Sequence, residues 1–243
     1  MATVNARQKV IYVARFREDL LREEASRYWT EVHAPMADGL DGMVGYVQNH
    51  VRGGIAHDGA WPLFDGFACE WWRDRGAYDD GMTTDEWQAI VDDGPMVFDV
   101  SSLRGMGVAV EETVLRAGGR GPAPGGHKQA FLMRFRADMP RAAAARHWRE
   151  VHAPLALAQP GMVRYVQNLV TGLIGDGGAI GPPEGAGFDG LAEVWFTDEE
   201  AWERASASEA WKASYADCVN FLDMSESTGL AASVEERVIK LPA

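Results

Sequence analysis

The chain has 243 residues and a formal net charge of −13. This charge excludes a general nucleic-acid-binding surface, which needs basic residues that neutralise phosphates. No run of about 18 apolar residues occurs, so no membrane span is expected. The first ten residues lack the apolar core of a secretory signal. The two cysteines, Cys69 and Cys218, fit neither a metal motif nor a disulfide framework. We therefore expect a cytoplasmic protein.

The first half of the chain alternates between strand and helix signals. Runs rich in Val, Ile, Tyr, Phe and Trp predict strands, and longer mixed segments with N-cap residues predict helices. The candidate N-caps are Asp19 for the first helix and Thr83 or Thr84 for the second. The predicted elements are a strand at 9–17, a helix at 19–32, strands at 43–51 and 64–72, a helix at 83–92 and a strand at 106–115.

The second half repeats the first. Trp-Thr-Glu-Val-His-Ala-Pro at 29–35 returns as Trp-Arg-Glu-Val-His-Ala-Pro at 148–154, an offset of 119 residues (148 − 29 = 119). Tyr-Val-Gln-Asn follows the same offset, and Phe-Asp-Gly follows an offset of 124 (189 − 65 = 124). A fixed offset over a whole chain is the mark of an internal duplication. The predicted elements of the second copy are 128–136, 140–151, 162–170, 188–196, 199–216 and 229–240.

Each copy has the element order β-α-β-β-α-β, which is the ferredoxin-like unit. This unit carries its helices on one sheet face, so the other face must be buried against something. We expect an α+β fold in which two tandem repeats pack sheet to sheet as an intramolecular pseudo-dimeric barrel, with space for a small ligand between the sheets. The expected boundaries are a first repeat at 1–116, a Gly/Pro linker at 117–127 and a second repeat at 128–243. This arrangement leaves both a monomer and a homodimer open.

The two repeated histidines are the first catalytic candidates. Pro35 and Pro154 are expected to end their helices, because proline lacks an N–H and disfavours α conformation before it. His33 and His152 would then stand at helix C-terminal ends, where carbonyls raise the pKa of an imidazole. Either could act as a general acid or base. The alternative is that each histidine bonds a backbone carbonyl and orders the turn.

The strands supply the second set of candidates. Strand alternation places Asp189, Leu191, Glu193 and Trp195 on one face, which we expect to be the barrel interior. Burial would raise the pKa of Glu193 and suit it to proton transfer. The alternative is a structural ion pair with Arg134 or Arg136. For Asp65 and Asp189, which open turns with the glycines that follow, a structural role is favoured.

Further side chains are candidates for substrate binding, and each has a structural alternative. A phenol and an amide that share a strand face can hold a carbonyl or hydroxyl group, an interior arginine can hold a carboxylate, and a tryptophan can line a pocket. The alternatives are cross-strand packing, an edge salt bridge and a place in the core. The candidates are Tyr46, Gln48, Tyr165, Gln167, Arg15, Arg134, Trp29 and Trp148.

These motifs together resemble the EthD family. The resemblance is carried by Trp-x-x-x-His-Ala-Pro, Gly-Met-Val-x-Tyr-Val-Gln-Asn and Phe-Asp-Gly, and it covers both copies. It implies a dimeric α+β barrel and, generally, no cofactor. Its relatives include ether-degradation proteins, lactone isomerases, and dehydratases or decarboxylases of polyketide pathways. One departure is Cys69, which stands where the second copy has Glu193. A small buried hydrophobic role is favoured for Cys69 over a reactive thiol.

The leading functional hypothesis is a cofactor-independent enzyme that acts on a small cyclic or polyketide-like molecule by His/Glu acid–base chemistry. The reaction would be of lyase (dehydratase or decarboxylase) or isomerase type, with His152, Glu193 and His33 as catalytic residues. A cofactor-free or haem-type monooxygenase of the same barrel superfamily is one alternative. A non-catalytic small-molecule binding protein is another. No metal is expected, because His57 and His127 lack partners at ligand spacing.

Overall fold

The computed structural model describes residues 7–54, 63–102, 106–118, 126–225 and 231–241. The strands are β1 (Gln8–Ala14), β2 (Met43–Gly54), β3 (Gly66–Trp72), β4 (Gly107–Arg116), β5 (His127–Met133), β6 (Met162–Ile174), β7 (Ile180–Gly181), β8 (Gly190–Phe196) and β9 (Ala231–Lys240). The α-helices are α1 (Arg22–Tyr28), α2 (Arg75–Gly81), α3 (Asp85–Asp93), α4 (Arg141–His147), α5 (Ala153–Leu157), α6 (Glu199–Ser206) and α7 (Glu209–Cys218).

The strands form one closed antiparallel barrel. The strand order is β4-β1-β3-β2-β9-β5-β8-β6, a β4–β6 pairing closes the ring, and β7 extends β6. The last strand of each repeat reaches into the other repeat: β4 pairs with β6, and β9 pairs with β2. The predicted pseudo-dimeric α+β barrel is thus confirmed, with the two sheets also joined edge to edge.

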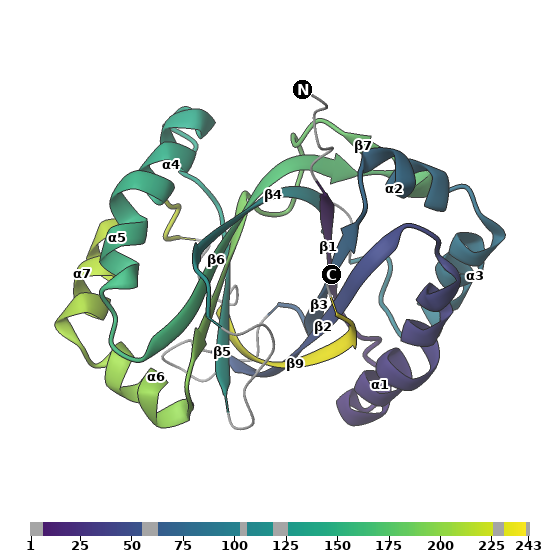
Figure 1. Cartoon of the computed structure of the whole chain (residues 1–243), viewed down its shortest axis with the longest axis horizontal. Coiled ribbons are helices and arrows are strands. Elements are labelled where there is room, and N and C mark those ends of the chain that lie inside the picture. The colour runs from purple at the N-terminus through teal and green to yellow at the C-terminus, as the bar shows by residue number, and fades with distance from the viewer. Residues whose placement is uncertain (1–6, 55–62, 103–105, 119–125, 226–230, 242–243) are drawn as a thin grey trace.

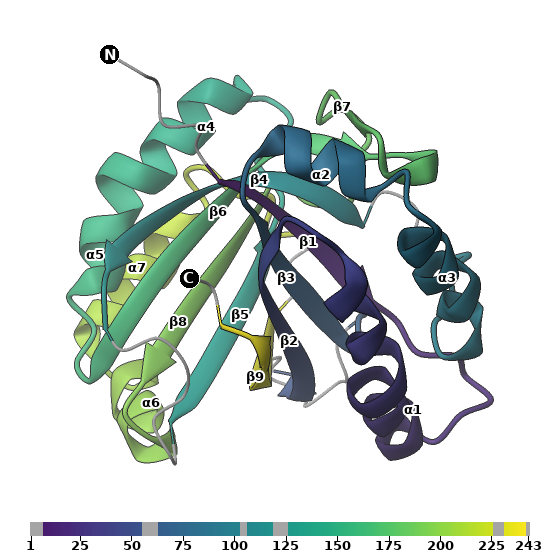
Figure 2. The same cartoon turned by 45° about the vertical axis from the view of Figure 1, so that its right-hand side comes forward.

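The helices cover the outside of this barrel. Helices α1–α3 lie against the strands of the first repeat and α4–α7 against those of the second, on opposite sides of the molecule (Figures 1 and 2). Each helix layer has its own apolar core, centred on Trp29 and Trp72 in one repeat and on Trp148 and Phe196 in the other. A third apolar cluster, which includes Ile11, Phe67 and Leu191, fills part of the barrel interior.

The repeated Trp-x-x-x-His-Ala-Pro segment does not end its helix as predicted. The helical path passes through a π-turn, Trp29–His33 or Trp148–His152, and continues into a further helical segment with the proline in its first turn. The N–H of Ala34 bonds to the carbonyl of Trp29, five residues back. Proline is compatible with this path because it stands at the start of the new segment, where its missing N–H costs little.

The predicted helix ends also need correction. Helix α1 begins at Arg22 without a side-chain cap, and Asp19 instead binds Arg17, with Oδ2 2.6 Å from Nη2. The segment after the third strand holds two helices in each repeat, because each helix has its own N-cap side chain that accepts a backbone N–H bond. The caps are Asp74 and Thr84 in the first repeat and Asp198 and Ser208 in the second. Most of the predicted linker, at 119–125, lies outside the described residues.

The Phe-Asp-Gly motif has a structural role in both repeats. Asp65 Oδ2 accepts a hydrogen bond from the N–H of Phe16 at 2.8 Å, and Asp189 Oδ2 accepts one from Phe135 at 2.9 Å. The glycine that follows lies under a tryptophan ring: a Cβ at Gly66 or Gly190 would stand 2.7 Å from the Cζ3 of Trp29 or Trp148. The motif therefore ties the third strand to the first strand and the helix layer.

Candidate functional site

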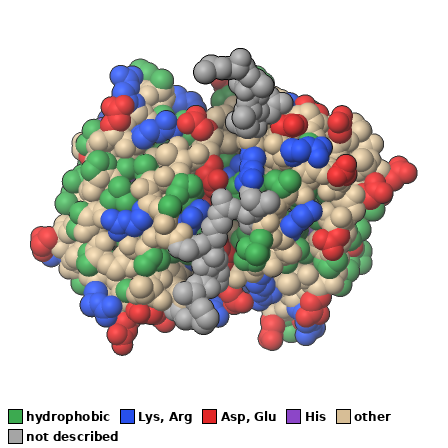
Figure 3. Space-filling view, viewed as in Figure 1, with side chains coloured by type: hydrophobic (Ala, Val, Ile, Leu, Met, Phe, Trp, Pro, Cys, Tyr) green, Lys and Arg blue, Asp and Glu red, His purple; other side chains and the backbone are tan. Residues whose placement is uncertain are grey.

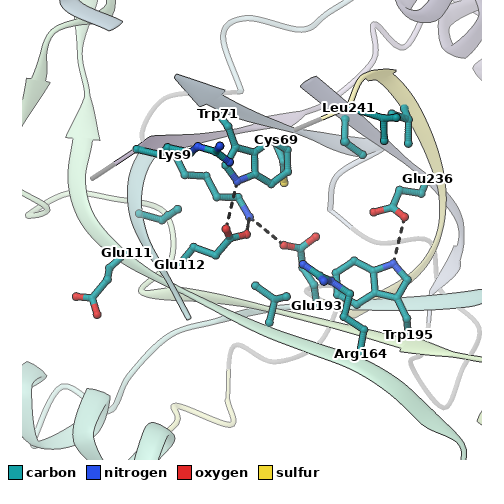
Figure 4. A pocket seen from close by; sticks show the side chains of 15 residues that line it. Lys9, Cys69, Trp71, Glu111, Glu112, Arg164, Glu193, Trp195, Glu236 and Leu241 are labelled. Atoms are coloured by element: carbon teal, nitrogen blue, oxygen red, sulfur yellow. Dashed lines mark hydrogen bonds and ion pairs between the residues drawn. The ribbon is translucent and has the colours of Figure 1, made fainter. Parts of the chain in front are cut away.

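A cavity of about 450 Å³ opens at one end of the barrel, next to Arg7 and Leu241 near the two ends of the described chain (Figure 4). Its volume is within the range of small-molecule sites. Acidic and basic side chains meet near the middle of the face shown in Figure 3. The lining residues are Arg7, Lys9, Val47, Cys69, Trp71, Val110, Glu111, Glu112, Arg164, Val166, Glu193, Trp195, Glu236, Val238 and Leu241.

Lys9 is at the inner end of this cavity and is 3% exposed. Its Nζ lies 2.7 Å from Glu112 Oε1, 2.7 Å from Asn168 Oδ1 and 3.4 Å from Glu193 Oε1. These contacts use all three N–H donors of the ammonium group. The Trp71 indole N–H donates to the second oxygen of Glu112 at 3.2 Å, and Lys9 Nζ is 4.5 Å from the centre of the Trp71 ring.

Lys128 repeats this arrangement in the second half. Its Nζ lies 2.6 Å from Asn49 Oδ1, 2.7 Å from Glu193 Oε2 and 2.9 Å from Glu236 Oε1. Trp195 donates to Glu236 at 3.1 Å, and Lys128 Nζ is 4.2 Å from the centre of the Trp195 ring. Glu193 therefore bridges two buried lysines, one from each repeat. We call Lys9, Lys128, Glu112, Glu193 and Glu236 the interior charge cluster.

Burial and charge act in opposite directions on this cluster. Burial alone would raise the pKa of Glu193, but the charges of Lys128 and Lys9, with hydrogen bonds from Lys128 and Asn168, lower it to about 2. Burial opposes the charged form of both lysines, yet the pKa of each is raised, with Glu193 as the largest favourable contribution. Burial raises the pKa of Cys69. At neutral pH the lysines and Glu193 are ionised and the thiol is protonated.

The sequence correctly placed Glu193 in the barrel interior, but its expected raised pKa is wrong. Two ammonium groups within hydrogen-bonding distance outweigh the desolvation of the carboxylate. The predicted alternative, an ion pair, is present, although Glu193 pairs with Lys9 and Lys128 rather than with Arg134 or Arg136. A carboxylate in this state can accept a hydrogen bond or a proton but cannot act as a general acid at neutral pH.

The two repeated histidines lie in the helix layers and do not line the cavity. His33 Nδ1 is 2.7 Å from Asp93 Oδ2, and His152 Nδ1 is 3.1 Å from Asp217 Oδ2. Burial lowers the pKa of His152, and Asp217 offsets this only in part, so the expected rise of the His152 pKa is wrong. The helix does not end at these histidines, which removes the free carbonyls that the expectation required. Their catalytic role stays a prediction.

The tyrosine, glutamine and tryptophan candidates also lie on the helix side of the sheet. Gln48 Nε2 donates to the Trp29 carbonyl at 3.0 Å and to the Tyr46 hydroxyl at 3.1 Å. Gln167 makes the same contacts, with the Trp148 carbonyl at 3.1 Å and the Tyr165 hydroxyl at 3.0 Å. Both amides are buried. Each holds the start of the π-turn against the second strand.

The arginine candidates follow the first strand of each repeat, away from the cavity lining. Arg15 Nη1 donates to the Leu63 carbonyl at 3.0 Å, and Arg15 Nη2 lies 3.7 Å from Glu18 Oε1. Arg134 accepts the N–H of Asp223 on its backbone carbonyl at 3.0 Å. Two other arginines line the cavity: Arg7, at the start of the described chain, and Arg164, whose guanidinium carbon is 5.2 Å from the centre of the Trp195 ring.

Sequence reasoning missed most of the interior charge cluster. The signal was present, because Lys9 and Lys128 follow the 119-residue offset (128 − 9 = 119) and each stands within a strand rich in apolar residues. Glu112 and Glu236 follow the second offset (236 − 112 = 124). Asn49 and Asn168 alternate with the glutamines that face the helices, so they face inward. A polar residue kept at matching positions of two buried strands marks an interior polar site.

The closed barrel of two ferredoxin-like repeats, with an interior charge cluster on its pseudo-twofold axis, defines the class of dimeric α+β barrel proteins in a single-chain form. The EthD domain profile matches the chain twice, at residues 17–101 and 136–225. The chain therefore belongs to the EthD family.

Solved structures show the same fold at low sequence identity. A Fusobacterium nucleatum subsp. nucleatum protein provisionally assigned as a monooxygenase aligns with a TM-score of 0.61 and 9% identity, over 98% of this chain and 94% of its own. An anthrone oxidase-like protein aligns with a TM-score of 0.61 and 12% identity, over 100% of this chain and 96% of its own. A Lactobacillus acidophilus NCFM protein, also provisionally assigned as a monooxygenase, aligns with a TM-score of 0.53 and 12% identity, over 98% of each chain.

Comparison with curated protein sequences finds no match. Within the described residues, none of the helices has the length and apolar character needed to cross a membrane. The same part of the chain contains no group of three or more His, Cys, Asp or Glu side chains placed to hold a metal ion.

Proposed function

We propose that this chain is an enzyme that binds a small cyclic organic molecule in the cavity at the barrel mouth and acts on it by proton transfer, as a lyase or isomerase. One observation carries the proposal: a cavity of ligand size, about 450 Å³, is lined by glutamate side chains that lie beside a buried lysine. Such a site can remove a proton from a bound molecule and stabilise the negative charge that develops.

Glu112 is the proposed proton acceptor. Its side chain is 25% exposed and lines the cavity, whereas Glu193 is 4% exposed and fixed between two lysines. Lys9 binds Glu112 directly and places a positive charge beside the reacting atoms. Glu193 is a positioning residue in this scheme, because it orders both lysines. The proton moves from a C–H or O–H of the substrate to Glu112, and its return to another atom of the substrate gives isomerisation. In an elimination, the proton taken from carbon passes to a departing hydroxyl, which leaves as water as the C–O bond breaks and a C=C bond forms.

The test is conversion of metabolites from a cell extract in D₂O, followed by mass spectrometry. Deuterium reveals proton transfer even when the product is an isomer of the substrate. Wild type and the control variant Glu209→Gln, which changes a helix carboxylate that is 88% exposed, should label or consume the same metabolite. Glu112→Gln should lose at least 100-fold in rate, within the range expected for general-base catalysis.

A metabolite that wild type binds in native mass spectrometry and returns unlabelled and unchanged would contradict the enzymatic proposal. It would instead support the non-catalytic binding protein. Equal labelling by wild type and Glu112→Gln would leave an enzyme but remove Glu112 from its chemistry.

A cofactor-free oxygenation is the second candidate. The structural neighbours provisionally assigned as monooxygenases share this fold, and removal of a proton from a ring is also the first step of a direct reaction with oxygen. Oxygen uptake that depends on the substrate would favour this candidate. The described cavity lining has no histidine to hold a haem iron.

A further inference from the structure

The pseudo-twofold axis gives the cavity a nearly symmetric frame. Each half contributes a tryptophan and a glutamate joined by a hydrogen bond, Trp71 with Glu112 and Trp195 with Glu236, and each half adds a valine, Val47 or Val166. A fully symmetric cavity would accept a ligand equally well in two orientations. The differences between the halves therefore decide how a ligand is seated.

Two pairs of matching positions break this symmetry. Cys69 stands where the second repeat has Glu193, and Gly45, paired with Trp71, stands where Arg164 is paired with Trp195. The Trp195 ring already contacts two cations, Lys128 at 4.2 Å and Arg164 at 5.2 Å. The Trp71 ring contacts Lys9 at 4.5 Å, and its Gly45 partner brings no side chain.

Matching side chains of the two halves also differ in exposure: Trp71 is half-buried, whereas Trp195 is buried. Lys9 and Val110 line the cavity, while their counterparts Lys128 and Val234 do not. Glu112 is 25% exposed, against 8% for Glu236. The accessible aromatic surface and the accessible carboxylate therefore both belong to the half that contains Cys69.

The inner end of the cavity accepts hydrogen bonds and has no spare N–H to offer. All three donors of Lys9 are used by Glu112, Asn168 and Glu193, and the Trp71 N–H is used by Glu112. Carboxylate oxygens, in contrast, have lone pairs left after these contacts. A ligand group that reaches this end must donate a hydrogen bond, because no N–H donor is left there to bind an acceptor.

The outer end has the opposite character. Arg164 carries five N–H donors, and one of them makes a long contact of 3.4 Å with the Gly118 carbonyl. Arg7 lies at the same opening and is exposed. A carbonyl or carboxylate of the ligand matches this end.

We infer that the cavity holds one ligand per chain in one orientation: a flat hydroxylated ring on Trp71, its hydroxyl donating to Glu112 and a carbonyl or carboxylate at its other end toward Arg164. The inference rests on the proposed function, which it deepens by naming the substrate class. It makes Trp71, Glu112 and Arg164 binding residues, and it makes Cys69 and Gly45 the residues that leave room for the ring.

The pseudo-symmetry supplies the matched controls for the test. 4-Hydroxybenzoate is titrated by calorimetry into wild type, Glu112→Gln and Glu236→Gln, and 4-methoxybenzoate and phenol are titrated into wild type. The expected results are a 1:1 complex with 4-hydroxybenzoate and binding at least tenfold weaker for both analogues. Affinity should fall at least tenfold in Glu112→Gln and less than threefold in Glu236→Gln. Circular dichroism confirms that each variant is folded.

Any one of four outcomes would overturn the inference. Equal losses of affinity in Glu112→Gln and Glu236→Gln would show that the two halves of the cavity bind the ligand alike, and the proposed function would stand. Methoxybenzoate binding as tightly as hydroxybenzoate, or no binding of 4-hydroxybenzoate at millimolar concentration, would remove the proposed ligand class alone. Hydroxybenzoate binding that neither variant nor Arg164→Ala changes would place the ligand outside the cavity and overturn the proposed function as well.

Discussion

The two repeats share one set of contacts on the helix side of their sheets and differ at a central position inside the barrel. On the helix side, Gln48 and Gln167 make the same two hydrogen bonds to the start of their π-turns. Inside, Cys69 faces Glu193 across the axis, and one carboxylate serves two lysines. Residues that are identical and make matching helix-side contacts hold the fold, whereas we assign ligand orientation to the interior positions that differ.

The largest expected effect is at the axis itself. Glu193→Ala leaves Lys9 and Lys128 buried with one fewer negative partner, and loss of one partner of a buried ion pair costs about 3–5 kcal/mol. Cys69→Ala, at the matching position, removes only a small apolar group and should cost about 1 kcal/mol. Urea unfolding of both variants measures the difference. Equal losses would contradict the assignment of Glu193 as the group that holds the interior charge cluster together.

Most of the fold could be predicted from the sequence because it depends on local patterns. The duplicated motifs, the alternation of strands and the position of Glu193 on the inner face are all periodic signals. The pairing of β4 and β9 with strands of the other repeat leaves no periodic signal in the sequence, because these partners are set by closure of the whole barrel.

The site was harder to predict than the fold. His33 and His152 stand out in the motif, yet their partners Asp93 and Asp217 are 60 and 65 residues away. Lys9 reaches Glu193 across 184 residues. A pKa depends on such distant partners, so the pattern could place Glu193 inside the barrel but could not show that two lysines keep it ionised.

Replacing the glycine at the start of the third strand, Gly66 or Gly190, should destabilise the protein in both repeats, but by different amounts. A Cβ at Gly66 would stand 2.7 Å from the Trp29 ring and 2.5 Å from the Asn49 carbonyl, while a Cβ at Gly190 would stand 2.7 Å from the Trp148 ring and 3.4 Å from the Asn168 carbonyl. Overpacking of this kind costs about 1–3 kcal/mol. Gly66→Ala should be near the upper end and Gly190→Ala near the lower end in urea unfolding. The reverse order would contradict the packing described for the two helix layers.

Glu70 gives the first repeat a pH dependence that the second repeat lacks, since Val194 stands at the matching position (194 − 70 = 124). Burial raises the pKa of Glu70 to about 7, and a hydrogen bond from Trp72 offsets this only in part. Stability from the neutral carboxyl is fully present below the unfolded pKa of about 4.5 and is lost as pH rises through 7.

Glu70→Gln should therefore be more stable than wild type by about 2 kcal/mol at pH 8. The difference should disappear near pH 4. Thermal unfolding across this pH range measures it, with Glu31→Gln, an exposed change, as the control. A constant difference between Glu70→Gln and wild type at every pH would contradict the raised pKa.

The smallest effect on turnover is expected from the helix-layer histidines. His33→Gln and His152→Gln together should leave conversion of the metabolite that wild type consumes within about twofold, because neither side chain lines the cavity. Each substitution should cost about 1 kcal/mol of stability through loss of its aspartate hydrogen bond. A 100-fold loss of turnover in a folded double variant would move the chemistry from the barrel to the helix layers.

A crystal structure of the protein soaked with 4-hydroxybenzoate tests the central claim most directly. The account predicts one ring per chain in the barrel mouth, lying on Trp71 with its hydroxyl within hydrogen-bonding distance of Glu112 and its carboxylate toward Arg164. A ring found between the sheet and the helices, beside His152 or His33, would contradict the account and make the helix layer the functional site.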